Sequence, residues 1–214
     1  YMTHEEASAG LDLDRYFKFA FVRDPFSRLL SAWRNKFDPS AGQVHEIWLE
    51  YAEKVRGKLA SHDDLGQGPL SFGDFVRYMD IQPVEEIPLH WAPQTRILAM
   101  DKFEYDFVGR IENIGEDFEV VRERVGFEAR FPTRDDLWFH PPTGADTLVS
   151  RMYTPELVDI VTRVFAGDFE AFGYPAAPCG DSGPRRRLSP PGNGMVSMPP
   201  NDHPAASSRA LARG

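Results

Sequence analysis

The sequence predicts an α/β domain with a short, mostly parallel sheet and helices on both of its faces. The strongest observation is the segment 17–37, in which an apolar, aromatic-rich run continues without a loop into an amphipathic helix. Short strands expected at 96–99 and 105–108 alternate with helical segments, which is typical of α/β domains. The chain has 214 residues, 42% of them hydrophobic, which is enough to bury one sizeable core.

The junction at 22–25 combines a strand end with a helix start. The run from Phe17 to Val22 suits a strand that is buried on both faces. Asp24 is a preferred helix N-cap, and Pro25 is tolerated at the first helical position because its missing N–H has no partner there. Apolar residues then recur at three- and four-residue spacing, which predicts one core-facing stripe: Phe26, Leu29, Leu30, Trp33 and Phe37.

Two polar residues at this junction indicate an anion site. Arg23 lies directly before the helix and offers a guanidinium fork that suits phosphate, while Ser31 lies two turns into the helix, outside the apolar stripe. Free N–H groups and the positive end of the helix dipole also favour an anion there. The alternative is an ordinary α/β junction whose arginine is solvated or paired with a carboxylate.

Further elements follow from apolar periodicity, caps and composition. Helices are expected at 44–59, at 72–79, at 114–125 and from Thr154 onward. Segments rich in proline, glycine or polar residues are expected to be loops, at 61–69, 81–94 and 133–150. Proline, glycine, serine and arginine dominate the C-terminal part, so we expect a domain over 1–175 and a disordered tail over 176–214.

Charge and hydropathy exclude some classes of protein. The net charge of −9 argues against a dedicated nucleic-acid binder. No apolar run approaches the length of a transmembrane helix, and the chain contains no signal peptide.

The junction segment FVRDPFSRLLSAWRNKF resembles the 3′-phosphate-binding motif of the carbohydrate sulfotransferases, in particular those of the chondroitin and dermatan type. The positions that match this motif are Arg23, Pro25, Arg28, Ser31, Arg34, Asn35, Lys36 and Phe37. Further segments resemble the family in the family's order: FGDFVRY at 72–78, HWAP at 90–93, YDFVGRIE at 105–112 with Glu116 and Asp117, and 153–174. The resemblance covers 15–174.

This resemblance implies a P-loop, nucleotide-kinase-like three-layer fold, and it also implies a particular reaction. Such enzymes move a sulfuryl group from 3′-phosphoadenosine 5′-phosphosulfate to a carbohydrate hydroxyl, and no metal is implied. Arg23 and Ser31 would hold the 3′-phosphate of the donor. Arg28 is a weaker candidate for the same pocket, and a salt bridge on the helix surface is its alternative.

His90 is the first candidate for the base that takes the proton of the acceptor hydroxyl, because it matches the family's His-Trp segment and histidine titrates near neutral pH. A structural role in a packed loop is the alternative. Glu112 and Asp106 are acidic candidates for the base, although a cap or an ion pair is the more ordinary role for each.

The sequence also departs from the family. Its first 16 residues contain no glycine-rich or basic loop for the donor's 5′-phosphosulfate, so we expect an N-terminally truncated chain that lacks half of the donor site. A truncated, non-catalytic module that binds sugar or a partner protein is therefore the main alternative function. Phosphoryl transfer from ATP is a weaker alternative, because no GxxxxGK[ST] loop is present.

Cysteine usage bears on localisation. Cys179 is the only cysteine, so no disulfide can form within the chain. Leu98 and Met100 stand where the Golgi relatives carry a cysteine pair. We therefore expect a reducing, cytoplasmic compartment of bacterial type, or a Golgi membrane location if a eukaryotic N-terminus is missing.

Overall fold

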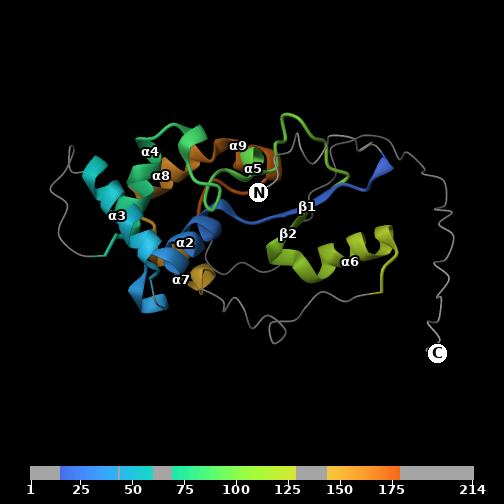
Figure 1. Ribbon diagram of the computed structural model, residues 1–214. Coiled ribbons are helices and arrows are strands. Elements are labelled where there is room, and N and C mark those ends of the chain that lie inside the picture. The colour runs from blue at the N-terminus through green and yellow to red at the C-terminus, as the bar shows by residue number, and fades with distance from the viewer. Residues whose placement is uncertain (1–14, 43, 60–68, 129–143, 179–214) are drawn as a thin grey trace, which may run out of the picture.

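The fold is known from a computed structural model, which describes residues 15–42, 44–59, 69–128 and 144–178 (Figure 1). The strands and α-helices are β1 (Phe19–Val22), α2 (Pro25–Lys36), α3 (Glu46–Leu59), α4 (Phe72–Asp80), α5 (Gln94–Ile97), β2 (Phe107–Arg110), α6 (Ile114–Val125), α7 (Ala145–Met152), α8 (Pro155–Val164) and α9 (Ala166–Phe172). Short 3-10 helices lie between them: η2 (Pro39–Ala41), η3 (Val84–Glu86) and η4 (Ile111–Asn113).

The described residues form one parallel sheet of two strands. In it Phe19 of β1 lies opposite Phe107 of β2, and Val22 lies opposite Arg110. The predicted α/β class with a short parallel sheet is confirmed at this level. Both strands end at the same edge, so the loops that follow them lie together there.

Gly109 lets the two strands carry large aromatic rings. It lies opposite Phe21, and a Cβ added to Gly109 would lie 2.5 Å from the Phe21 ring. That ring also meets the Phe107 ring edge to face, at a centroid distance of 6.4 Å. A side chain at position 109 would therefore force the Phe21 ring to shift.

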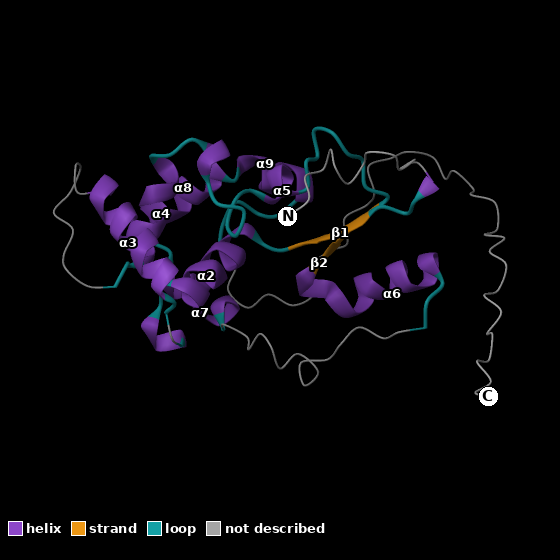
Figure 2. Cartoon of the chain, viewed as in Figure 1, coloured by secondary structure: helices purple, strands orange, loops and turns teal. Residues whose placement is uncertain are grey.

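The main core lies among the helices. Figure 2 shows α2, α3, α4, α7 and α8 gathered at one end of the molecule, with the sheet and α6 toward the other. The side chain of Trp91 is fully buried in this core. Its ring lies against those of Phe75, Tyr51 and Phe37, at centroid distances of 5.2, 5.4 and 5.9 Å.

The predicted helices are largely confirmed. The helices expected at 44–59, 72–79 and 114–125 are α3, α4 and α6, with ends that differ by two residues at most. The final helix is divided into α8 and α9 at Phe165. Val125, the last residue of α6, is 49% exposed although α6 is amphipathic.

Two predicted elements are wrong. The strand expected at 96–99 is occupied by α5 and the turn after it, and β2 begins two residues later than the predicted 105–108 strand. The loop expected at 133–150 contains the start of α7 at Ala145, while 133–143 lies outside the described residues. The expectations for 1–14, 61–68 and 179–214 also lie outside them.

Candidate functional site

The helix start after β1 is capped by the chain itself. The Asp24 carboxylate is buried and its Oδ1 accepts a hydrogen bond of 2.9 Å from the Ser27 N–H, with Pro25 in the first helical position. This confirms the predicted cap. The anion expected near the first N–H groups of α2 stays a prediction, and it would share that helix end with the Asp24 carboxylate.

The backbone of Arg23 is held on both sides by one side chain. Gln94 Oε1 accepts a 2.8 Å hydrogen bond from the Arg23 N–H, and Gln94 Nε2 donates a 2.8 Å hydrogen bond to the Arg23 carbonyl. Gln94 is buried and Arg23 is half-buried. The paired amide contacts therefore fix the point from which the Arg23 guanidinium extends.

A fully buried carboxylate supports this clamp from α9. Asp168 accepts hydrogen bonds from the Gln94 N–H at 2.7 Å, from the Thr95 N–H at 2.8 Å and from the Thr95 hydroxyl at 2.9 Å. These contacts cap α5, which explains why a helix and not a strand follows Pro93. Asp168 thus ties the C-terminal helix to the site.

Arg28 holds the segment that carries His90. Its Nη1 donates a 2.7 Å hydrogen bond to the Ala92 carbonyl, and its Nη2 lies 3.4 Å from the His90 carbonyl and 3.5 Å from that of Leu89. These contacts with backbone carbonyls replace the surface salt bridge that was the alternative for Arg28. Its predicted phosphate contact stays a prediction.

The charges of Arg23 and Arg28 act on each other. Burial lowers the pKa of Arg28, the charge of Asp168 raises that pKa, and the charge of Arg23 lowers it. The two guanidinium groups are therefore within electrostatic reach of each other. Ser31, which is half-buried, lies three positions after Arg28 on α2 and so on the same side of the helix. The structure thus gathers Arg23, Arg28 and the His90 backbone.

His90 is exposed, and its ring rests on a tryptophan. The centroids of the His90 and Trp48 rings are 5.4 Å apart and the ring planes are nearly perpendicular. Lys36 Nζ lies over the Trp48 ring, 4.7 Å from its centroid. Partial burial lowers the pKa of His90, and the positive charge of Lys36 lowers it further.

The two acidic candidates for the base are engaged in structural contacts. Glu112 accepts hydrogen bonds from the Asp24 N–H at 2.7 Å and from the Tyr174 hydroxyl at 2.9 Å. Asp106 accepts one of 2.7 Å from the Lys18 N–H. These are the cap-like and pairing roles that were expected as the more ordinary role of each carboxylate.

Sequence reasoning did not single out Gln94, Asp168, Trp48 or Lys36 as parts of the site. Asp168 and Lys36 lie within segments that resemble the family, which was a usable signal. Gln94 directly follows the HWAP segment. Nothing in the sequence indicated Trp48, because α3 matched no family segment and Trp48 read only as part of its apolar face.

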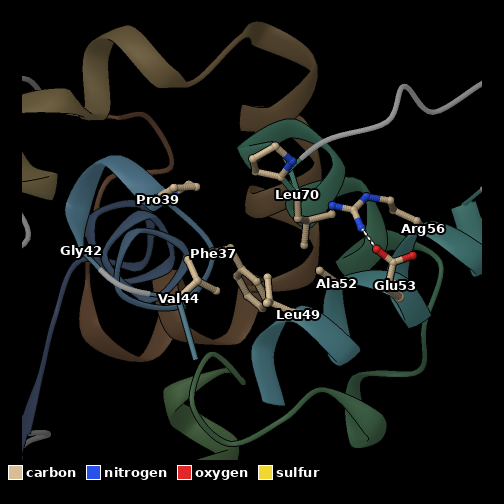
Figure 3. Close-up of a pocket in the computed structure, with 10 residues that line it drawn as sticks. Phe37, Pro39, Gly42, Val44, Leu49, Ala52, Glu53, Arg56 and Leu70 are labelled. Atoms are coloured by element: carbon tan, nitrogen blue, oxygen red, sulfur yellow. Dashed lines mark hydrogen bonds and ion pairs between the residues drawn. The ribbon is translucent and has the colours of Figure 1, made fainter. Parts of the chain in front are cut away.

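A separate hollow of about 490 Å³ lies beside α3 (Figure 3). Its lining is mostly apolar and includes Phe37, Leu49 and Leu70. Its charged residues, Glu53 and Arg56, form an ion pair with each other. None of the predicted site residues lines this hollow, so it is not part of the site described above.

Two features of the described residues bear on function. No group of three or more histidine, cysteine, aspartate or glutamate side chains among them is placed to hold a metal ion. None of the helices formed by these residues has the length and apolar character needed to cross a membrane.

Comparison with known proteins decides the family. The model of the Sulfotransferase family matches residues 2–175, which include the junction, the His90 segment and α9. The chain belongs to this sulfotransferase family. No solved structure matches it significantly.

Relatives of this chain include carbohydrate sulfotransferases. The chain is 34% identical over 168 residues to carbohydrate sulfotransferase 14 of Danio rerio, covering 76% of this chain and 45% of the relative. The same enzyme of Mus musculus is 36% identical over 173 residues, covering 76% and 43%. Carbohydrate sulfotransferase 12 of Xenopus laevis is 29% identical over 181 residues, covering 77% and 41%. The chain thus spans less than half the length of these relatives.

Proposed function

We propose that the protein is an enzyme that transfers a sulfuryl group from 3′-phosphoadenosine 5′-phosphosulfate to a hydroxyl group of a carbohydrate. Membership of the sulfotransferase family and the names of the relatives support the reaction class and the acceptor class. The observation that carries the proposal is the Gln94 clamp on Arg23, which fixes a cation at the end of β1.

In this proposal Arg23 and Ser31 hold the 3′-phosphate of the donor. The donor is a polyanion, and the charges of Arg23 and Arg28 lie within reach of each other at the edge where β1 and β2 end. The proposal assigns the phosphate contacts to side chains, since the Asp24 carboxylate already accepts from the Ser27 N–H at the helix start. A guanidinium fork on a fixed backbone suits a phosphate group.

His90 is the proposed base. Sulfuryl transfer, like phosphoryl transfer, depends chiefly on in-line placement and on neutralising charge on the transferred group. The hydroxyl proton of the acceptor passes to the His90 imidazole as the new oxygen–sulfur bond forms, and the nucleotide leaves. A lowered pKa keeps this imidazole unprotonated near neutral pH, as a base must be. The proposal needs no metal.

The finer fold assignment is part of the same proposal. A P-loop, nucleotide-kinase-like architecture is consistent with the parallel β1–β2 pair and with the helix that follows β1 directly. Because the chain spans less than half of its relatives, we assign the reaction to the full-length protein. The cytoplasmic or Golgi location stays a prediction, since Cys179 lies outside the described residues.

The test is transfer of labelled sulfate by the full-length protein. With donor labelled in its sulfuryl group and a panel of neutral and acidic oligosaccharides, we expect label in at least one acceptor. The His90→Gln variant should bind the donor normally and lose at least about a hundredfold in turnover. Donor binding without transfer to any acceptor would favour the non-catalytic module, and turnover unchanged in His90→Gln would exclude His90 as the base.

A further inference from the structure

Three side chains from separate segments meet at His90. Lys36 is the last residue of α2, Trp48 lies in the first turns of α3, and His90 belongs to the irregular segment before α5. The His90 and Trp48 rings meet edge to face with their centroids 5.4 Å apart. The Lys36 ammonium lies over the Trp48 ring, 4.7 Å from its centroid. The cluster thus places a positive charge and an indole beside the proposed base.

Trp48 is itself held firmly. Its ring meets those of Trp91, Phe37 and Tyr51 at centroid distances of 5.7, 5.9 and 6.4 Å. On the backbone side, the Arg28 guanidinium lies against the carbonyls of the His90 segment. The His90 imidazole therefore lies against the packed Trp48 ring, and its own backbone is held by Arg28.

We propose that Lys36 and Trp48 are positioning residues for the sulfuryl-transfer reaction, which hold the His90 imidazole against the indole in the unprotonated form that a base requires. This inference rests on the proposed function, since it takes His90 as the base. Trp48 sets the orientation of the ring through its edge-to-face contact. Lys36 acts through its charge, which opposes a second positive charge on the imidazole.

The charges around His90 support this division of roles. Two cations, Lys36 and Arg28, come from α2. Burial is the main cause that lowers the His90 pKa, and the charge of Lys36 is the second. From α3 come the uncharged indole of Trp48 and, behind it, the phenol of Tyr51, whose pKa burial raises. Burial lowers the pKa of the Lys36 amine too, from an ordinary value of about 10.4 that lies far above neutral.

The first test follows the proton on His90 itself. The His90 ring signal is identified by its loss in His90→Gln, and its titration is followed by NMR in the full-length protein. In Lys36→Met the midpoint should rise by on the order of half a pH unit, because a nearby positive charge is removed. Lys36→Arg keeps the charge and should leave the midpoint in place. Lys58→Met is the matched control, because Lys58 also lies over an aromatic ring, that of Tyr78.

The second test follows the reaction. In Lys36→Met the acidic limb of the plot of kcat against pH should move to higher pH by the same amount, and full turnover should return at alkaline pH. In Lys36→Arg the turnover should match that of the wild type. Trp48→Leu should lower kcat at every pH while the KM for the donor changes little. Thermal unfolding identifies variants that fail to fold, for which Lys36→Gln and Trp48→Phe are the replacements.

The results separate this inference from the function on which it rests. An unmoved NMR midpoint in Lys36→Met and Lys36→Gln would overturn the role of Lys36 whatever the reaction is. A moved midpoint with an unmoved kcat profile would overturn the role of the cluster in the reaction and the choice of His90 as base. Neither result would affect donor binding by Arg23, which is measured independently.

Discussion

The Arg23 junction and the His90 segment meet in one site, yet they are held in different ways. At the junction, the strand β1, the Asp24 cap and helix α2 follow one another along the chain, and the cap is a local hydrogen bond to Ser27. The His90 segment has no regular structure of its own over 88–93, and its carbonyls are held by Arg28 from α2.

This difference predicts that the two halves of the site can be damaged separately. The junction should keep its helix start when contacts around His90 are removed, because the Asp24–Ser27 cap is local and the Asp24 N–H is held by Glu112, outside the His90 segment. The His90 segment should lose its shape when a distant side chain is removed. Gln94 is the exception, because it directly follows the His90 segment and its side chain binds the Arg23 backbone, while Asp168 holds Gln94 in turn.

The largest effect is expected from Asp168→Ala. Loss of this fully buried carboxylate leaves the Gln94 and Thr95 N–H groups without their acceptor, which should lower the free energy of unfolding by about 2–4 kcal/mol. Urea denaturation measures the loss. Asp159→Ala, an exposed change on α8, is the control and should cost less than about 0.5 kcal/mol. Equal stability of the two variants would refute the coupling of the halves through Asp168.

A smaller effect, confined to the His90 half, is expected from Arg28→Met. The buried carbonyl of Ala92 loses its strongest donor, so the free energy of unfolding should fall by about 1–3 kcal/mol. Turnover of the full-length protein should fall by a larger factor than the affinity for the donor, which Arg28 supports only as the weaker phosphate candidate. A loss of donor affinity as large as that of Arg23→Ala, with kcat retained, would instead make Arg28 a phosphate ligand.

The smallest effect, confined to the junction, is expected from Asp24→Ala. Removing an N-cap acceptor costs about 1 kcal/mol, while Asp24→Asn keeps an oxygen for the Ser27 N–H and should cost less. Denaturation measures both variants. The NMR midpoint of His90 should stay in place in each, and a shift of that midpoint would show that the two halves are not separable.

The same contrast explains what the sequence could predict. The Asp24 cap and the apolar stripe of α2 were predicted because each depends on residues three or four positions apart. The strand expected at 96–99 was wrong because α5 is capped by Asp168, 74 positions from Gln94 in sequence. No local pattern carries that contact.

For the site as well, some residues were predicted from the sequence and others were missed. Arg23, Ser31, Arg28 and His90 were proposed from family segments, and the structure brings Arg23 and Arg28 near each other, with Arg28 against the His90 backbone. The Asp24 cap predicted at the start of α2 is confirmed, and the anion expected beside it stays a prediction. The Lys36–Trp48–His90 cluster was missed because it needs the packing of α2 against α3.

The central claim is that Arg23 binds the 3′-phosphate of a nucleotide donor. Isothermal titration of the full-length protein with 3′-phosphoadenosine 5′-phosphate tests it, with adenosine 5′-phosphate as the ligand that lacks the 3′-phosphate. Arg163→Ala, which changes an exposed arginine of α8, is the control. We expect Arg23→Ala to weaken binding of the bisphosphate at least about tenfold and to leave the weak binding of the monophosphate unchanged. Equal affinity of the wild type for both nucleotides, or no loss in Arg23→Ala, would contradict the account.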